Sequence, residues 1–259
     1  MVRDFRLPLL EGKPMKLGLL LLGLVLTLSL ASAQDAPGIV ERILGNLRGA
    51  SQVATLNMQV VRPDEEDKYT MRIFSEGETK GLTRVISPPR DAGQAFLNDG
   101  DNVFIYSPRL RRVLRLPPSG QSDSFLGSDI SYNDLAGDDL QKYYDASILE
   151  DTGESVTLEL TPKQGAPTPY GKINLTAQKP SYAPTQITYF DQRDTAVKEN
   201  VLSDYAEVDG LYIPQRFEMK DLLTEGNMTV VTWQDAEFGV DIPESCFSQN
   251  ALEREGACE

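Results

Sequence analysis

The sequence predicts a mainly β protein of the α+β class, built on a single curved antiparallel sheet. Two observations carry this prediction. Apolar and polar residues alternate through most of the chain after residue 54, and turn dipeptides separate the alternating stretches. A period of two is typical of strands with one buried face. We expect about 10–11 strands, and because so wide a sheet does not stay flat, we expect it to curl or close.

The first element of the mature chain is predicted to be a helix over residues 36–49. Its apolar residues recur at the spacing of a helix face, and Pro37 suits a first helical turn. The residues that form this face are Ile39, Val40, Ile43, Leu44 and Leu47.

The strands are expected in two groups separated by an irregular stretch. The first group covers 54–61, 69–73, 82–86 and 103–106, with a strong hairpin signal at Asn98–Asp101. The second group covers 156–160, 172–176, 185–190, 197–205, 211–219 and 227–233. Asp209-Gly210 and Glu225-Gly226 are its clearest turns.

Two stretches are available to cover the concave side of the sheet. Residues 117–142 are rich in Pro, Ser, Gly and Asp, and together with the helix over 36–49 they are expected to cover its apolar face. A short helix near 244–254 is expected to close the chain.

The composition excludes several classes of function. The chain has 25 Lys and Arg against 39 Asp and Glu, and no His, for a formal net charge of −14. This acidity argues against nucleic acid or an anionic membrane as a main partner. Without His there is no His-based triad and no His-ligated zinc or haem, and two Cys are too few for a Cys-only metal site. We expect no cofactor and no metal.

The N-terminus is typical of an export signal over residues 1–33. Lys16 precedes an apolar run over 17–30, and Ala31-Ser32-Ala33 is a small-x-small cleavage site. The alternative is a retained membrane anchor, but the 14-residue run is shorter than the roughly 20 residues that a span needs. The true start is possibly Met15. We expect residues 34–259 to form the mature domain, soluble and periplasmic.

The two cysteines fit an exported protein. Cys246 and Cys258 are expected to form a disulfide that closes a short loop. The alternative, a redox-active pair, lacks the C-x-x-C spacing.

Residues 104–135 depart from the rest of the chain in charge. Four arginines fall within seven positions, at 109, 111, 112 and 115. If this stretch is extended, alternation places Arg109, Arg111 and Arg115 on one face, where they could contact an anionic head group or a partner. The alternative is a solvated strand face whose arginines pair with Asp123, Asp129 or Asp134.

The same segment carries a resemblance to a known family. It contains Tyr-x-Pro at 106–108, Arg-Arg-Val at 111–113 and Ser-Asp-Ser-Phe-x-Gly-Ser-Asp-x-x-Tyr-x-Asp-Leu at 122–135, and a further Tyr-x-Pro stands at 212–214. This pattern resembles the outer-membrane lipoprotein-sorting protein family, which is similar to the periplasmic carriers LolA and LolB.

The resemblance implies a fold and a function. The fold is an incomplete antiparallel β-barrel, curved around an apolar cavity with helical lids. The function is a non-enzymatic carrier that binds acyl chains of a lipoprotein or lipid in transit to the outer membrane. Its partners would be an inner-membrane transporter and an outer-membrane acceptor.

Other side chains have two interpretations each. Phe104, Tyr106 and Trp233 lie in strand-like stretches, where core and cavity lining share one face, so they are candidate ligand contacts.

Gly127-Ser128-Asp129 is expected to form a tight turn in which Ser128 and Asp129 bond nearby amides and cap a short helix over 132–136.

Three alternatives to the carrier remain open. A non-enzymatic periplasmic subunit that docks on an envelope transporter would have a filled sheet interior and bind no lipid. A calcium site could use five carboxylates, at Asp123, Asp129, Asp134, Asp138 and Asp139, although no EF-hand loop is present. A glycosidase with paired carboxylates is the remaining enzymatic alternative, although no carboxylate pair is marked by its neighbours.

Overall fold

The computed structural model describes residues 35–48, 51–77, 79–100, 102–136, 140–254 and 256–258. The expected signal peptide (1–33) and the alternative start Met15 lie outside the described residues. Residues 34–259 form one compact unit. Among the described residues, none of the helices has the length and apolarity needed to cross a membrane.

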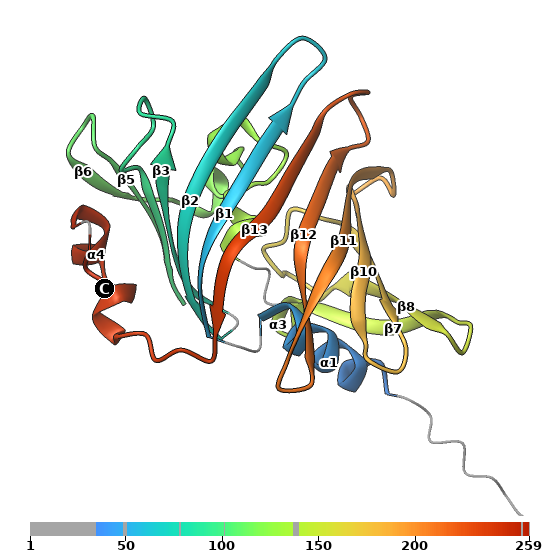
Figure 1. Cartoon of the computed structure of the whole chain (residues 1–259). Coiled ribbons are helices and arrows are strands. Elements are labelled where there is room, and N and C mark those ends of the chain that lie inside the picture. Colours follow the sequence, from blue (N-terminus) through green and yellow to red (C-terminus); the bar gives the residue numbers. More distant parts are fainter. Residues whose placement is uncertain are drawn as a thin grey trace, which may run out of the picture. The chain divides into compact units, whose positions relative to one another are not determined.

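In the described residues, thirteen strands form a single antiparallel sheet (Figure 1). The strands are β1 (Gln52–Val61), β2 (Glu66–Glu76), β3 (Lys80–Ser87), β4 (Ala95–Asp99), β5 (Val103–Ser107), β6 (Arg112–Arg115), β7 (Tyr144–Asp151), β8 (Ser155–Pro162), β9 (Lys172–Gln178), β10 (Ala183–Phe190), β11 (Ala196–Val208), β12 (Leu211–Asp221) and β13 (Met228–Phe238). Their order is β6-β5-β4-β3-β2-β1-β13-β12-β11-β10-β9-β8-β7. The sheet is not closed, because β6 and β7 form its two edges.

The fold class is confirmed, but the expected number of strands is wrong. The sequence predicted 10–11 strands, and the described part of the chain holds 13. Strand β7 was missed because most of its side chains are exposed at the edge of the sheet, so it has no alternating pattern. Strand β6 is only four residues long, and its side chains are likewise mostly exposed.

Helix α1 (Ala36–Arg48) packs against the β7–β12 half of the sheet, as its apolar spacing predicted. Ile43 is fully buried among residues of this half, including Leu158 and Leu175. The buried Asn46 holds the end of the helix in place. Its amide nitrogen donates to the Ser181 carbonyl at 3.0 Å, and its oxygen accepts the Tyr212 amide at 2.6 Å.

Residues 117–136 cover the other half of the same face, and we call them the roof segment. They contain two 3-10 turns, η1 (Pro118–Gly120) and η2 (Phe125–Gly127), and the helix α2 (Tyr132–Ala136). Phe125 is buried against β1–β5, and its ring lies 5.6 Å from that of Tyr132 and 6.3 Å from that of Phe96. Burial, and then the negative charge of Asp123, raise the pKa of the Tyr132 phenol. The short helix α3 (Leu140–Tyr143) follows the roof segment.

The end of the chain covers the opposite face of β3–β6. The turn η3 (Glu244–Phe247) and helix α4 (Gln249–Glu253) occupy the region predicted to be helical near 244–254, beside these strands (Figure 1). Leu252 is fully buried there against the sheet. Cys246 and Cys258 are joined by a disulfide with Cα atoms 4.9 Å apart, as predicted.

The disulfide is expected to stabilise the C-terminal segment. The bond closes a loop with a sequence separation of 12, for which chain entropy predicts roughly 3 kcal/mol. We expect the double substitution Cys246→Ala/Cys258→Ala to lower the free energy of unfolding by about that amount, measured by urea denaturation. The wild type in reductant is the control. An unchanged midpoint in both would contradict this expectation.

Candidate functional site

An apolar cavity of about 270 Å³ lies between the sheet, helix α1 and the roof segment. It sits where β1 and β13 pair, and it is bounded by both halves of the sheet. Half of its twenty lining residues are apolar or aromatic: Leu47, Leu56, Ile130, Leu135, Ile187, Tyr189, Phe217, Met219, Val231 and Trp233. Eight others are polar or charged: Arg48, Gln52, Ser75, Thr79, Lys80, Asn98, Asp134 and Asn200. An apolar wall combined with polar groups is typical of small-molecule sites.

The two halves of the core meet at this cavity. Val231 on β13 stands opposite Met58 of β1 on one side and Phe217 of β12 on the other, so the three side chains share one face. Phe217 and Ile130 pack against the buried residues of both halves. The cavity is therefore an incompletely filled part of one continuous apolar layer.

Two cations are among the polar residues that line the cavity. They are Arg48, at the end of α1, and Lys80, at the start of β3. The ammonium of Lys80 forms an ion pair with Glu244 of η3 at 2.8 Å, on the opposite face of the sheet, and the hydrogen bond between them raises the pKa of Lys80. Arg48 is therefore the cation of the two that can hold the anionic end of a ligand in the cavity.

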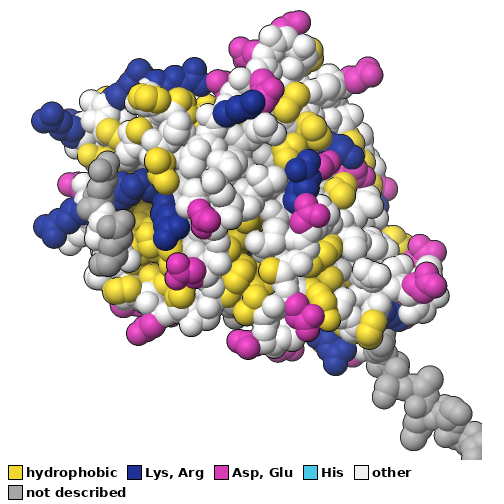
Figure 2. Space-filling model, viewed as in Figure 1, with side chains coloured by type: hydrophobic (Ala, Val, Ile, Leu, Met, Phe, Trp, Pro, Cys, Tyr) yellow, Lys and Arg dark blue, Asp and Glu magenta, His cyan; other side chains and the backbone are white. Residues whose placement is uncertain are grey.

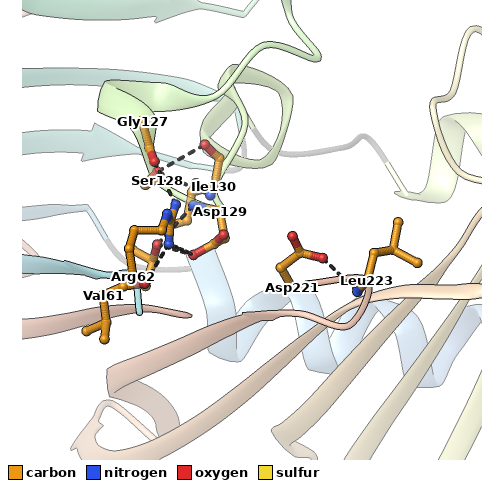
Figure 3. Close-up of polar contacts among 9 residues, drawn as sticks. Val61, Arg62, Gly127, Ser128, Asp129, Ile130, Asp221 and Leu223 are labelled. Atoms are coloured by element: carbon orange, nitrogen blue, oxygen red, sulfur yellow. Dashed lines mark hydrogen bonds and ion pairs between the residues drawn. The ribbon is translucent and has the colours of Figure 1, made fainter. Parts of the chain in front are cut away.

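A buried ion pair fastens the roof segment to the centre of the sheet (Figure 3). Asp129, whose side chain is 5% exposed, forms an ion pair with Arg62 at 2.9 Å. Its Oδ2 accepts the Thr229 hydroxyl at 2.7 Å, and its amide donates to the same hydroxyl oxygen at 2.9 Å. Arg62 also donates to the carbonyls of Gly127 and Val61. Arg62, directly after β1, and Thr229 of β13 thus supply the partners that hold this turn.

A second carboxylate fastens the other end of the roof segment. Asp134 of α2 accepts the Tyr170 hydroxyl at 3.0 Å and forms an ion pair with Lys198 of β11 at 3.2 Å. It also accepts the Ser131 amide at 2.8 Å, while Ser131 Oγ accepts the Asp134 amide at 3.1 Å. The roof segment is therefore held by both halves of the sheet.

The expectation for Gly127-Ser128-Asp129 needs one correction. Gly127 has a positive φ of 73°, and Ser128 Oγ accepts the Ile130 amide at 3.2 Å, so the tight turn is confirmed. The helix over 132–136 also exists, but Ser131 caps it. Asp129 instead binds Arg62 and Thr229, which sequence reasoning missed because they lie 67 and 100 residues away along the chain.

The expected ladder of three arginines does not form. Arg109 and Arg111 lie in the turn between β5 and β6, where Arg111 has a φ of 50°, and only Arg115 belongs to β6. The turn breaks the alternation on which the ladder depended. None of the three lines the cavity.

The expected arginine partners in the roof segment are also wrong in two cases. Asp129 pairs with Arg62, and Asp134 pairs with Lys198, rather than with any of the arginines of 109–115.

The three aromatic candidates lie on different faces of the sheet. Trp233 lines the cavity. Phe104 and Tyr106 pack on the opposite face, with the disulfide and helix α4. In the part of the chain that the structure describes, no group of three or more Asp, Glu, Cys or His side chains is placed to hold a metal; Asp138 and Asp139 lie outside it.

Comparisons with known proteins match the chain to a family. A family model described as "Uncharacterized protein" matches residues 77–254. The chain belongs to that family. None of the curated proteins matches the chain.

Solved structures place the fold among the LolA-like proteins. A domain from Vibrio parahaemolyticus, described as an outer membrane lipoprotein-sorting protein domain, is 25% identical with a TM-score of 0.75, over 85% of this chain and 98% of that one. A LolA superfamily protein from Nitrosomonas europaea is 22% identical with a TM-score of 0.71, over 85% and 100%. A DUF1329 family protein from Desulfovibrio piger is 21% identical with a TM-score of 0.75, over 84% and 97%.

The resemblance predicted from residues 104–135 is therefore confirmed. The chain is similar to outer-membrane lipoprotein-sorting proteins and has a LolA-like fold.

The Arg62–Asp129 pair provides a test of the roof segment. We expect Arg62→Met to lower the free energy of unfolding by about 2–3 kcal/mol, because it leaves the Asp129 carboxylate buried without its cation. Fluorescence of Trp233, the only tryptophan, should shift to the red as the neighbouring roof segment loosens.

The matched control is Arg216→Met, which breaks the more exposed pair with Glu218 and should cost less than about 1 kcal/mol. Equal effects of the two substitutions would show that the buried pair does not hold the roof segment.

Proposed function

We propose that this protein is a periplasmic carrier that shelters an acyl chain of a lipoprotein or lipid on its way to the outer membrane. The observation that carries the proposal is the apolar cavity beneath the roof segment, in a fold shared with lipoprotein-sorting domains. Trp233 and Phe217 are the proposed aromatic contacts with the acyl chain, and Arg48 is the proposed contact with its anionic end. The expected export signal and the disulfide support a periplasmic location.

The size of the cavity limits the cargo. Its volume of about 270 Å³ lies just below the ~300–1,000 Å³ of typical small-molecule sites, so it suits part of one acyl chain. Burying about eight methylenes would contribute roughly 6 kcal/mol, which corresponds to a dissociation constant in the range of tens of micromolar. A cargo with two or more chains would require the roof segment to move.

The proposed role is binding and transfer without covalent chemistry. An inner-membrane transporter would supply the cargo and an outer-membrane acceptor would receive it. Release from an apolar cavity into water is unfavourable, so transfer would need contact with the acceptor or opening of the roof segment.

A cavity-blocking substitution tests the proposal. We expect Leu135→Trp, on the cavity wall formed by α2, to weaken binding of a fluorescent fatty acid at least tenfold, measured by titration of the mature protein. Leu149→Trp, on the exposed edge strand β7, is the matched control and should bind as the wild type does. Circular dichroism spectra of both variants establish that they are folded.

Native mass spectrometry of the protein purified from its own envelope, followed by organic extraction, identifies the cargo. A bound acylated mass supports the carrier. An empty protein that also fails to take up the fatty acid would overturn it and favour the alternative, a docking subunit of an envelope transporter. The filled layer under α1, where Leu158 and Leu175 are fully buried, is the arrangement that this alternative predicts.

A further inference from the structure

The hairpin of β5 and β6 reverses the charge of the protein over a short distance. Residues 102–122 contain no Asp or Glu, but they contain Arg109, Arg111, Arg112 and Arg115, in a chain whose net charge is −14. We call residues 108–115 the cationic hairpin. Lys and Arg side chains gather at the upper left of the molecule, over the β5–β6 edge of the sheet (Figure 2).

All four arginines are exposed and none is neutralised within the described residues. No side-chain hydrogen bond or ion pair joins them to another part of the described chain. By contrast, Arg62, Arg90 and Arg216 each form an ion pair with a carboxylate. In an acidic protein, four adjacent unpaired cations are an arrangement suited to an external anion.

Two leucines stand among these cations. Leu110, in the turn, is 62% exposed, and Leu114, on β6, is 43% exposed. Arg112 and Arg115 project to opposite faces of β6, because they are an odd number of residues apart in a strand. The hairpin therefore surrounds exposed apolar side chains with positive charge.

The backbone of the hairpin is held firmly at its base. Strand β5 pairs with β4 on one side and with β6 on the other, and the Leu116 amide donates to the Val103 carbonyl at 2.8 Å. The hairpin can thus present its tip without paying a large ordering cost on binding.

We propose that the cationic hairpin docks the protein on an anionic lipid surface, with the arginines on lipid phosphates and Leu110 and Leu114 in the interfacial layer. Cations around exposed leucines are the composition that binds this layer. The net charge of −14 does not prevent this docking, because at physiological salt a charge acts over only about 8 Å. The charge of the hairpin itself therefore determines whether this surface attracts an anionic lipid. The proposal does not depend on whether the cavity holds a ligand.

The size of the hairpin favours a lipid surface over an acidic protein. A stable protein interface uses about 20–30 residues on each side, whereas the cationic hairpin has eight. A lipid surface needs no fixed shape complementarity, and its phosphates can adjust to arginines on both faces of the strand.

The test measures sedimentation of the mature protein with vesicles of phosphatidylglycerol and phosphatidylcholine at a ratio of 1:3. We expect binding that falls as salt rises from 25 to 250 mM and is at least tenfold weaker to phosphatidylcholine alone. The variant R109Q/R111Q/R112Q/R115Q should bind about a hundredfold or more weakly, since each arginine near an anionic surface is worth about fivefold. The variant L110S/L114S should bind at least tenfold more weakly.

Two matched variants separate local from overall charge. R42Q/K68Q/K142Q/R193Q removes four exposed cations elsewhere, and I148S/L149S removes two exposed apolar side chains on the opposite edge strand β7. Both should bind vesicles as the wild type does, and all four variants should keep the fatty-acid affinity of the wild type.

Absence of vesicle binding by the wild type, or equal losses in the hairpin and control variants, would overturn the proposal. Cross-linking of the hairpin to an acidic protein, without vesicle binding, would assign it to a protein partner instead. Failure of fatty-acid binding would overturn the carrier and leave the lipid-docking proposal standing.

Discussion

The pairing of β1 with β13 is the constraint on which the rest of the structure depends. It joins the first strand of the described residues to the last, so that two meanders become a single sheet. The cavity lies on this seam, with Leu56 from β1 and with Val231 and Trp233 from β13 on its wall. The same two strands bring Arg62 and Thr229 together beneath the roof segment. Weakening this pairing would therefore remove the sheet, the cavity wall and the fastening of the roof together.

Polar anchors give the roof segment a defined position over an apolar face. Apolar packing alone is not directional, and a segment held only by Phe125 could settle in several ways. Buried carboxylates are costly without partners, so Asp129 and Asp134 stabilise the one arrangement in which both reach a cation. Such anchors are compatible with the proposed opening of the roof segment, because charged side chains are stable once they are hydrated.

The sequence predicts the features that depend on local pattern. The alternation around Leu56 and the helical spacing of Ile43 gave the correct element types, and the two cysteines gave the correct disulfide. Strand β7 has no such pattern, because an exposed edge places few demands on its side chains. Long-range partners such as Arg62 for Asp129 leave no local signal. The predicted ladder of arginines was wrong because the chain turns at Arg111, so the side chains do not alternate between two faces as they would in a continuous strand.

The arginines of β6 also have a simpler explanation, which is protection of a sheet edge. Exposed edges invite pairing with other chains, and charged side chains discourage it. The opposite edge, β7, carries Asp145, Glu150 and Asp151, together with the exposed Ile148 and Leu149. Edge protection does not account for Leu110, which lies in the turn beyond the strand. It also does not account for the arginines in that turn, because the turn has no strand edge that could pair with another chain. The combination is explained if the hairpin must avoid other chains and still bind an apolar, anionic surface.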